Sequence, residues 1–128
     1  MSKILTVGFS LFSLNVINCN AQKFYPEVDS TLTRIDLAKE AGKIKVQGVY
    51  TGKNTEALFY KLTIQKKGKS GTSNNAQSGN FKKNPVEKEH VLSTSGFNFQ
   101  PGDVFTIMLE VYQNARRISV EFLNYQVP

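Results

Sequence analysis

The alternation of apolar and polar residues over Glu56–Lys66 constrains the fold of this chain more than any other feature. Successive side chains of a β-strand point to opposite faces, so a period of two predicts one buried face and one solvated face. The apolar positions of this segment are Leu58, Tyr60, Leu62 and Ile64. The intervening, mostly polar positions are Phe59, Lys61, Thr63 and Gln65. The segment is therefore predicted to be a strand that covers a core with one face.

Segments of the same kind recur along the chain and are separated by turn-forming residues. Further strands are predicted over residues 31–38, 43–50, 72–81, 88–99, 104–113 and 116–125. Tight turns are predicted at 41–43, 100–103 and 114–115, the second with Pro and Gly in the order of a type II turn. No segment keeps a 3.6-residue period long enough for a helix of three turns. About seven strands in this arrangement predict an all-β chain folded as an immunoglobulin-like antiparallel β-sandwich.

The last two predicted strands form the most clearly marked hairpin. The apolar face of 104–113 is predicted to consist of Phe105, Ile107, Leu109 and Val111. The returning strand is predicted to contribute Ile118, Val120 and Phe122. These residues and those of Glu56–Lys66 are enough to close two sheets over one core.

The first 21 residues have the composition of a segment that is removed on export. Lys3 precedes a mostly apolar run, and small residues stand at Cys19 and Ala21, the −3 and −1 positions of a cut before Gln22. We therefore predict a signal peptide over residues 1–21 and a single secreted domain over 22–128. The apolar run is too short to span a bilayer, so no membrane insertion is expected.

Cys19 raises the alternative of a lipid anchor, because a cysteine directly after an apolar run is a known acylation site. The residue before it is Asn18 rather than a small residue, which disfavours this alternative. Cleavage before Gln22 leaves a domain with no cysteine, because the sequence contains only one. Such a domain has no disulfide and depends on core burial for its stability.

Positive charge is concentrated in the middle of the chain. Between Ala57 and Val86 the sequence has lysines at 61, 66, 67, 69, 82 and 83 and no acidic residue. We predict a turn over 66–70 and a weak edge strand over 72–81, with Phe81 pointing inward. The lysines have two compatible interpretations: they protect a sheet edge against self-association, or they attract an acidic partner. The candidate partner-binding residues are Lys66, Lys67, Lys69, Lys82, Lys83, Arg116 and Arg117.

The sequence offers few groups for catalysis. His90 is the only histidine, and the strand period places it on the opposite face from Glu87 and Glu89. Glu110 and Glu121 could face each other across the last hairpin as a carboxylate pair, although exposed alternating positions explain them more simply. No nucleophile elbow and no glycine-rich phosphate loop is present. We expect no enzyme activity, no cofactor and no metal site, and a basic protein outside the cytoplasm is not expected to bind nucleic acid.

Several elements in order resemble the CsgH family of curli assembly proteins. These are a strand that begins with an aromatic residue and ends in a charged turn at Gly68, a Ser/Gly/Gln-rich segment over 77–81, the LST at 92–94, and the PGD at 101–103 before an alternating strand. The resemblance covers about residues 31–123. It implies an immunoglobulin-like sandwich, located in the periplasm, that keeps amyloid subunits from polymerising before export. It implies neither enzyme activity nor a cofactor.

The related CsgC proteins carry a Cys-x-Cys pair, which has no counterpart in residues 22–128, so a thiol-redox role does not follow from the resemblance. The resulting hypothesis is a monomeric, chaperone-like inhibitor of curli-type amyloid formation, whose partner is a curlin-like subunit and whose binding is transient and charge-steered. The alternative is a secreted immunoglobulin-like adhesion or carbohydrate-binding module. That alternative requires exposed aromatic residues clustered on one face, whereas Phe59, Tyr112 and Tyr125 are expected to be scattered. A periplasmic redox or hydrolytic enzyme is the third, least favoured class.

Overall fold

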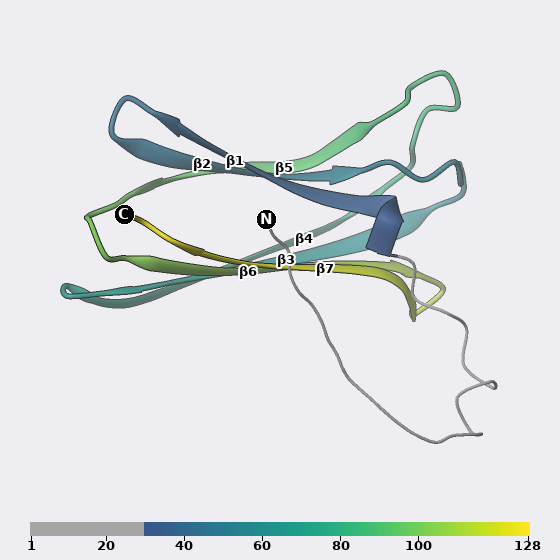
Figure 1. The fold of residues 1–128 in the computed structure, drawn as a ribbon. Coiled ribbons are helices and arrows are strands. Elements are labelled where there is room, and N and C mark those ends of the chain that lie inside the picture. The colour runs from purple at the N-terminus through teal and green to yellow at the C-terminus, as the bar shows by residue number, and fades with distance from the viewer. Residues whose placement is uncertain (1–29) are drawn as a thin grey trace.

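The computed structural model describes residues 30–128 as a sandwich of two antiparallel β-sheets (Figure 1). One sheet has the strand order β1-β2-β5 and the other the order β4-β3-β6-β7. A short 3-10 helix, η2 (Ser30–Leu32), precedes the first strand. The strands are β1 (Thr33–Glu40), β2 (Lys43–Tyr50), β3 (Leu58–Gly68), β4 (Gly71–Phe81), β5 (His90–Asn98), β6 (Val104–Gln113) and β7 (Arg116–Gln126). The predicted immunoglobulin-like sandwich of about seven strands is confirmed.

The turns of the fold follow from local backbone chemistry. Ala41 and Gly42 have φ of 49° and 79°, and Asn114 and Ala115 have φ of 52° and 65°. Two positive φ values in a two-residue connection are the mark of the type I′ turn, whose twist matches that of the flanking strands. The turn at 100–103 is closed by the Asp103 amide, which donates to the Gln100 carbonyl over 3.1 Å. The three turns predicted from sequence are therefore confirmed, while the turn predicted over 66–70 is shorter, because β3 continues to Gly68.

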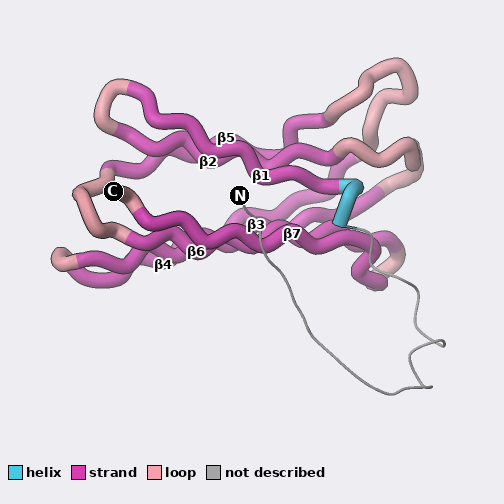
Figure 2. The backbone as a smooth tube through the Cα atoms, in the orientation of Figure 1, coloured by secondary structure: helices cyan, strands magenta, loops and turns pink. Residues whose placement is uncertain are grey.

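The core lies between the two sheets, which Figure 2 shows as two layers of strands. Leu62, Phe105, Ile107 and Leu109 are completely buried in it. The predicted inward faces of 58–64 and 105–111 are thus confirmed. A smaller cluster at the other end of the sandwich contains Tyr50, Leu58 and Val111, with Phe81 and Ile118 packed against it.

The predicted face of the last strand is wrong beyond Ile118. The register of β6 and β7 shifts between Val111 and Tyr112, so that Ser119 pairs with Val111 and Arg117 with Tyr112. This bulge leaves Ile118 without a partner and exchanges the two faces of the strand that follows. Val120 and Phe122 consequently lie on the outer face of the sheet, opposite Glu110 and Met108, and Phe122 is 56% exposed. The inward positions of β7 are Ser119, Glu121, Leu123 and Tyr125, which pair with the buried residues of β6.

Polar contacts close the sandwich along both sides. On the β4 side, Ser93 of β5 donates to the Gln77 side-chain carbonyl, and the Gln77 amide donates to Ser95. On the opposite side, the hydroxyls of Thr33 and Ser119 are 2.9 Å apart and buried. Each contact joins one sheet to the other, so it satisfies buried polar groups and fixes the spacing of the two layers.

The predicted signal peptide, its cleavage site before Gln22 and the alternative anchor at Cys19 lie outside the described residues. Within residues 30–128, no helix has the length and apolar character needed to cross a membrane.

Candidate interaction surface

The predicted basic residues occupy three corners of the four-stranded sheet instead of one continuous patch. Gly68 pairs with Gly71 at one end of β3 and Leu58 pairs with Phe81 at the other, so Lys67 and Lys69 are separated from Lys82 by the length of the strand. At a rise of ~3.3 Å per residue, the 11 residues of β3 span roughly 33 Å. Arg116 lies at the β6–β7 turn, at the same end as Lys82 but on the opposite edge. Because charges in physiological salt are screened beyond ~8–10 Å, these corners act independently.

Three of the predicted partner-binding residues have structural partners. Lys83 is 5% exposed, and its ammonium donates to the Glu87 carbonyl within the loop after β4. Lys66 lies on the inward side of β3 and donates to the Asn98 carbonyl over 3.0 Å. Arg117 is paired with the buried Glu110 at 2.9 Å. Lys83 therefore does not belong to the exposed basic surface, because its side chain is buried and its ammonium donates within its own loop.

Four of the predicted basic residues remain exposed and have no ion-pair partner within residues 30–128. We call these the corner cations: Lys67, Lys69, Lys82 and Arg116.

Between the corners, β4 forms an edge without any charged residue. Its sequence is GTSNNAQSGNF, and it pairs with β3 over all 11 positions without a break in register. Within the described part of the chain, its other edge is not paired with a strand. The first six residues, Gly71–Ala76, are all exposed. The edge strand predicted over 72–81 is confirmed, but the lysines flank this edge at its ends and do not lie along it.

The other three edges of the sandwich have charged side chains or β-bulges, which discourage strand pairing. β1 has the sequence TRIDLAKE, with four charged side chains along its length. β7 begins with Arg116 and Arg117 and contains the bulge at Ile118. β5 is uncharged, but its register with β2 is broken between Gly48 and Val49. Charges and bulges are the usual protection of exposed edges, and β4 has neither.

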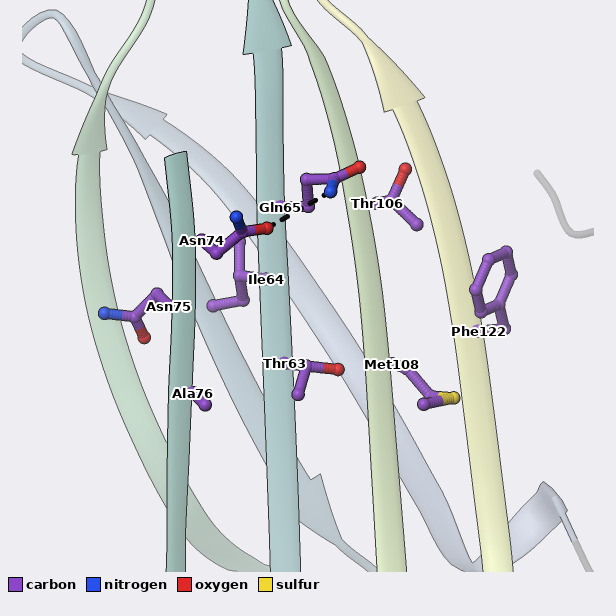
Figure 3. Close-up of a pocket in the computed structure, with 9 residues that line it drawn as sticks. All are labelled: Thr63, Ile64, Gln65, Asn74, Asn75, Ala76, Thr106, Met108 and Phe122. Atoms are coloured by element: carbon purple, nitrogen blue, oxygen red, sulfur yellow. Dashed lines mark hydrogen bonds between the residues drawn. The ribbon is translucent and has the colours of Figure 1, made fainter. Parts of the chain in front are cut away.

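A shallow hollow crosses the outer face of the same sheet next to β4 (Figure 3). Its volume is about 400 Å³, and it extends from Asn74 and Ala76 of β4 across β3 and β6 to Phe122 of β7. The Gln65 amide donates to the Asn74 side-chain carbonyl over 3.1 Å at one rim. The opposite rim is the cross-strand pair of Met108 and Phe122.

Two aromatic residues that are far apart in sequence, the exposed Phe59 and the partly buried Tyr112, meet on this outer face. Phe59 and Tyr112 are direct cross-strand partners, and their ring centroids are 6.3 Å apart. They border a second hollow of about 570 Å³ together with Lys61 and Asn80. Tyr125, by contrast, packs against the main core. The expectation that these three aromatic residues are scattered is therefore wrong for the first two, because pairing of β3 with β6 brings them together.

The Tyr112 ring is held in place by a buried acid. Its hydroxyl donates to Glu110 Oε2 over 2.9 Å, and Arg117 donates to the same oxygen at the same distance. Glu110 is only 6% exposed although it lies on the outer face of the sheet. Burial raises the pKa of the Tyr112 phenol, and the hydrogen bond to Glu110 and the charge of that group raise it further. The phenol therefore remains protonated and serves as a fixed donor.

The residues considered for catalysis do not form a catalytic arrangement. Glu110 pairs with Val120 and Glu121 with Leu109, so the two carboxylates point to opposite faces of the last hairpin. His90 stacks on Phe81 with the ring centroids 5.4 Å apart. Its Nδ1 lies 3.6 Å from Glu87, so the predicted separation of these two groups is wrong, because β5 begins only at His90 and Glu87 does not follow the strand period. Within residues 30–128, no cluster of three His, Cys, Asp or Glu side chains could hold a metal ion.

The three-stranded sheet carries an ion-pair cluster of its own. The Arg34 guanidinium contacts Asp36 at 2.8 Å and Glu89 at 2.6 Å. Hydrogen bonds to Glu89 and Asp36 raise the pKa of Arg34, and the bond from Arg34 lowers the pKa of Glu89. The cluster joins β1 to the segment before β5, so it is a structural feature of this sheet.

Comparison with known proteins yields matches in structure only: no family model and no characterised protein sequence matches the chain. The solution structure of CsgH from R. palustris is similar with a TM-score of 0.58 and 22% identity, over 73% of this chain and 89% of that one. The E. coli curli protein CsgC is similar with a TM-score of 0.55 and 15% identity, over 70% of this chain and 94% of that one. The chain therefore has the fold of the CsgH and CsgC curli proteins, as its sequence resemblance predicted.

Proposed function

We propose that this protein is a periplasmic, chaperone-like inhibitor that delays the polymerisation of a curli-type amyloid subunit. The observation that carries the proposal is the shared fold, because both of the similar structures are curli proteins and each is covered almost completely. The catalytic candidates of the described chain do not converge, which favours binding over chemistry. In this proposal the protein acts as a monomer and without a cofactor.

The corner cations supply the proposed charge steering. The chain has a formal net charge of +6, or +5 without Lys3 of the predicted signal peptide, so an acidic subunit is attracted electrostatically. The corner cations have no ion-pair partner within residues 30–128, so they can follow a moving partner without losing an ion pair there. Contacts of this kind are brief and are weakened by salt. They suit an inhibitor that meets many subunits or nuclei in turn and works below one-to-one stoichiometry.

The test is the lag time of polymerisation of a purified curli subunit, followed by amyloid-dye fluorescence. We expect the parent protein to lengthen the lag at low salt and to do so less as salt rises. A variant with all corner cations changed to Gln is expected to lose most of the delay. The matched control changes the same number of exposed lysines on other parts of the sandwich, namely Lys39, Lys43, Lys53 and Lys88. A corner variant that delays assembly as well as the control at every salt concentration would show that charge steering at the corners is wrong.

A carbohydrate-binding module is the second candidate, and the pairing of Phe59 with Tyr112 favours it. Exposed aromatic rings next to polar side chains are a common platform for apolar faces of ligands. Lys61 and Asn80 border the same hollow and supply hydrogen-bond donors. Calorimetric titration with neutral and acidic polysaccharides tests this candidate. Saturable heat that disappears in Tyr112→Ala would support it, and no heat with any of the polysaccharides would exclude it in favour of the amyloid inhibitor.

A further inference from the structure

We propose that the edge of β4 that is unpaired within residues 30–128 binds an extended, uncharged segment of the partner by β-strand addition. The expected segment is rich in Asn, Gln, Ser and Gly. This inference rests on the proposed function for the identity of the partner, an amyloid subunit, and it assigns that partner a specific binding edge.

The backbone of β4 meets the requirement for an added strand. A strand that is hydrogen-bonded on one side presents alternate N–H and C=O groups on the other side, and these groups are a template for another chain. β4 offers this template over 11 residues in a regular register with β3. It has no proline, which would remove a donor, and no charged residue, which would oppose pairing.

The second half of the β4 template is also anchored to the rest of the fold. Gln77 is bonded to Ser93 and Ser95 of the facing sheet. The Phe81 ring contacts Tyr50, Tyr60 and His90, with centroid distances of 5.3, 6.2 and 5.4 Å. An edge that is already ordered loses little conformational entropy on binding, so most of the ordering cost falls on the added segment.

Side chains of β4 favour an uncharged polar segment. The outward-facing positions are short and exposed, and they are Thr72, Asn74, Ala76, Ser78 and Asn80. A neighbouring strand places its side chains beside these at the usual cross-strand spacing, where amide side chains stack into ladders. Longer side chains of the added strand can reach the hollow that begins at Asn74 and Ala76 (Figure 3). Charged side chains in the same places find no partner on β4.

The corner cations work against the obvious competing occupant, which is a second copy of this protein. In an antiparallel pair of β4 strands, Lys69 at one end of each strand comes close to Lys82 at the end of the other. In a parallel pair, each lysine meets its own equivalent. Both arrangements bring like charges together, which is destabilising. A segment that is uncharged in the middle and neutral or acidic at its ends avoids this repulsion. The edge therefore favours the partner segment over a second copy of this protein.

Amide hydrogen exchange read by mass spectrometry tests the inference. The probe is a purified curli subunit, freshly released from denaturant and mixed with the full chain before fibres form. We expect exchange over residues 71–81 to slow by about tenfold or more when the subunit is added, because free edge amides become hydrogen-bonded. Exchange over the opposite edge strand, residues 116–126, is expected to stay unchanged.

A pair of matched variants links this protection to inhibition. Ala76→Lys with Ser78→Lys adds charge to β4, whereas Asn124→Lys with Gln126→Lys adds the same charge to exposed positions of β7. Thermal unfolding confirms that both variants are folded. The β4 variant is expected to lose the exchange protection and the delay of polymerisation, and the β7 variant is expected to keep both. If charge steering alone caused the delay, the β4 variant would delay polymerisation at least as well as the parent, because it is more basic.

The outcomes separate this inference from the proposed function. Delayed polymerisation without slower exchange over 71–81 would overturn strand addition and leave the inhibitor intact. Slower exchange without any delay would support strand addition and overturn the inhibitor. Slower exchange over 71–81 that appears with rising protein concentration alone would overturn the inference in favour of a second copy.

Discussion

The change Leu109→Ala tests the central packing of the sandwich most sharply. Leu109 is completely buried on β6, and it pairs with Leu62 on the neighbouring strand. A Cβ atom built on Gly48 of the facing sheet would lie 3.3 Å from Leu109 Cδ2, so the leucine fills the space in front of a residue without a side chain. The facing position therefore has no side chain that can move into the cavity left by Leu109→Ala. We expect the free energy of unfolding to fall by about 3–5 kcal/mol, the upper part of the range for buried leucines.

The control for this change is Thr106→Ala on the outer face of the same strand. Thr106 is partly exposed, and its hydroxyl donates to the Asn124 side chain over 2.8 Å. Loss of one exposed hydrogen bond is expected to cost about 0.5–1 kcal/mol. Urea unfolding at constant m-value measures both changes. Equal losses would mean that the register of β6 is shifted by one residue, since such a shift exchanges the two faces.

A double-mutant cycle adds a test that does not depend on absolute stability. Gly48→Ala alone places a methyl group against Leu109 and is expected to cost about 1–3 kcal/mol by overpacking. In the Leu109→Ala background the same methyl group enters the new cavity, so its cost is expected to fall to near zero or become a gain. Additive effects of the two changes would show that the two residues are not in contact.

Three further predictions concern other parts of the chain. Gly68→Ala should lower the free energy of unfolding by about 1–3 kcal/mol, because the new Cβ would lie 1.8 Å from Asp103 Oδ1; unchanged urea unfolding would contradict this packing. The Glu89 pKa lies below its usual value because of the hydrogen bond from Arg34. The contribution of the Arg34–Glu89 contact to folding stability is therefore full above the unfolded pKa of ~4.3, and it is lost as pH falls through the folded pKa of Glu89. A carboxyl NMR titration in which Arg34→Ala leaves the Glu89 pKa unchanged would refute this cause. Intact mass of the exported protein should show cleavage before Gln22, and a lipid-modified Cys19 would contradict it.

Much of the fold could be predicted from sequence because local rules and tertiary packing agree in this chain. The period-two patterns of Leu58–Ile64 and Phe105–Val111 indicated the inward faces correctly. The Pro101–Gly102 turn followed from φ preferences of single residues. The strand over 72–81 has weak strand propensity, and it could be placed because a long structureless loop is uncommon in a compact domain.

Features that depend on pairing between distant residues could not be predicted. The bulge at Ile118 leaves no local signal, yet it turns Val120 and Phe122 outward. The meeting of Phe59 with Tyr112 depends on the register of β3 with β6. A lysine count likewise could not show that Lys83 is buried or that the corner cations lie at opposite ends of the sheet.

The central claim is tested most directly by the lag time of curli-subunit polymerisation. This lag is measured with increasing amounts of the mature protein at low and high salt. The account predicts a lag that lengthens with added protein well below one-to-one stoichiometry and a delay that shrinks at high salt. A lag that is unchanged at every ratio and salt concentration would contradict the proposed function.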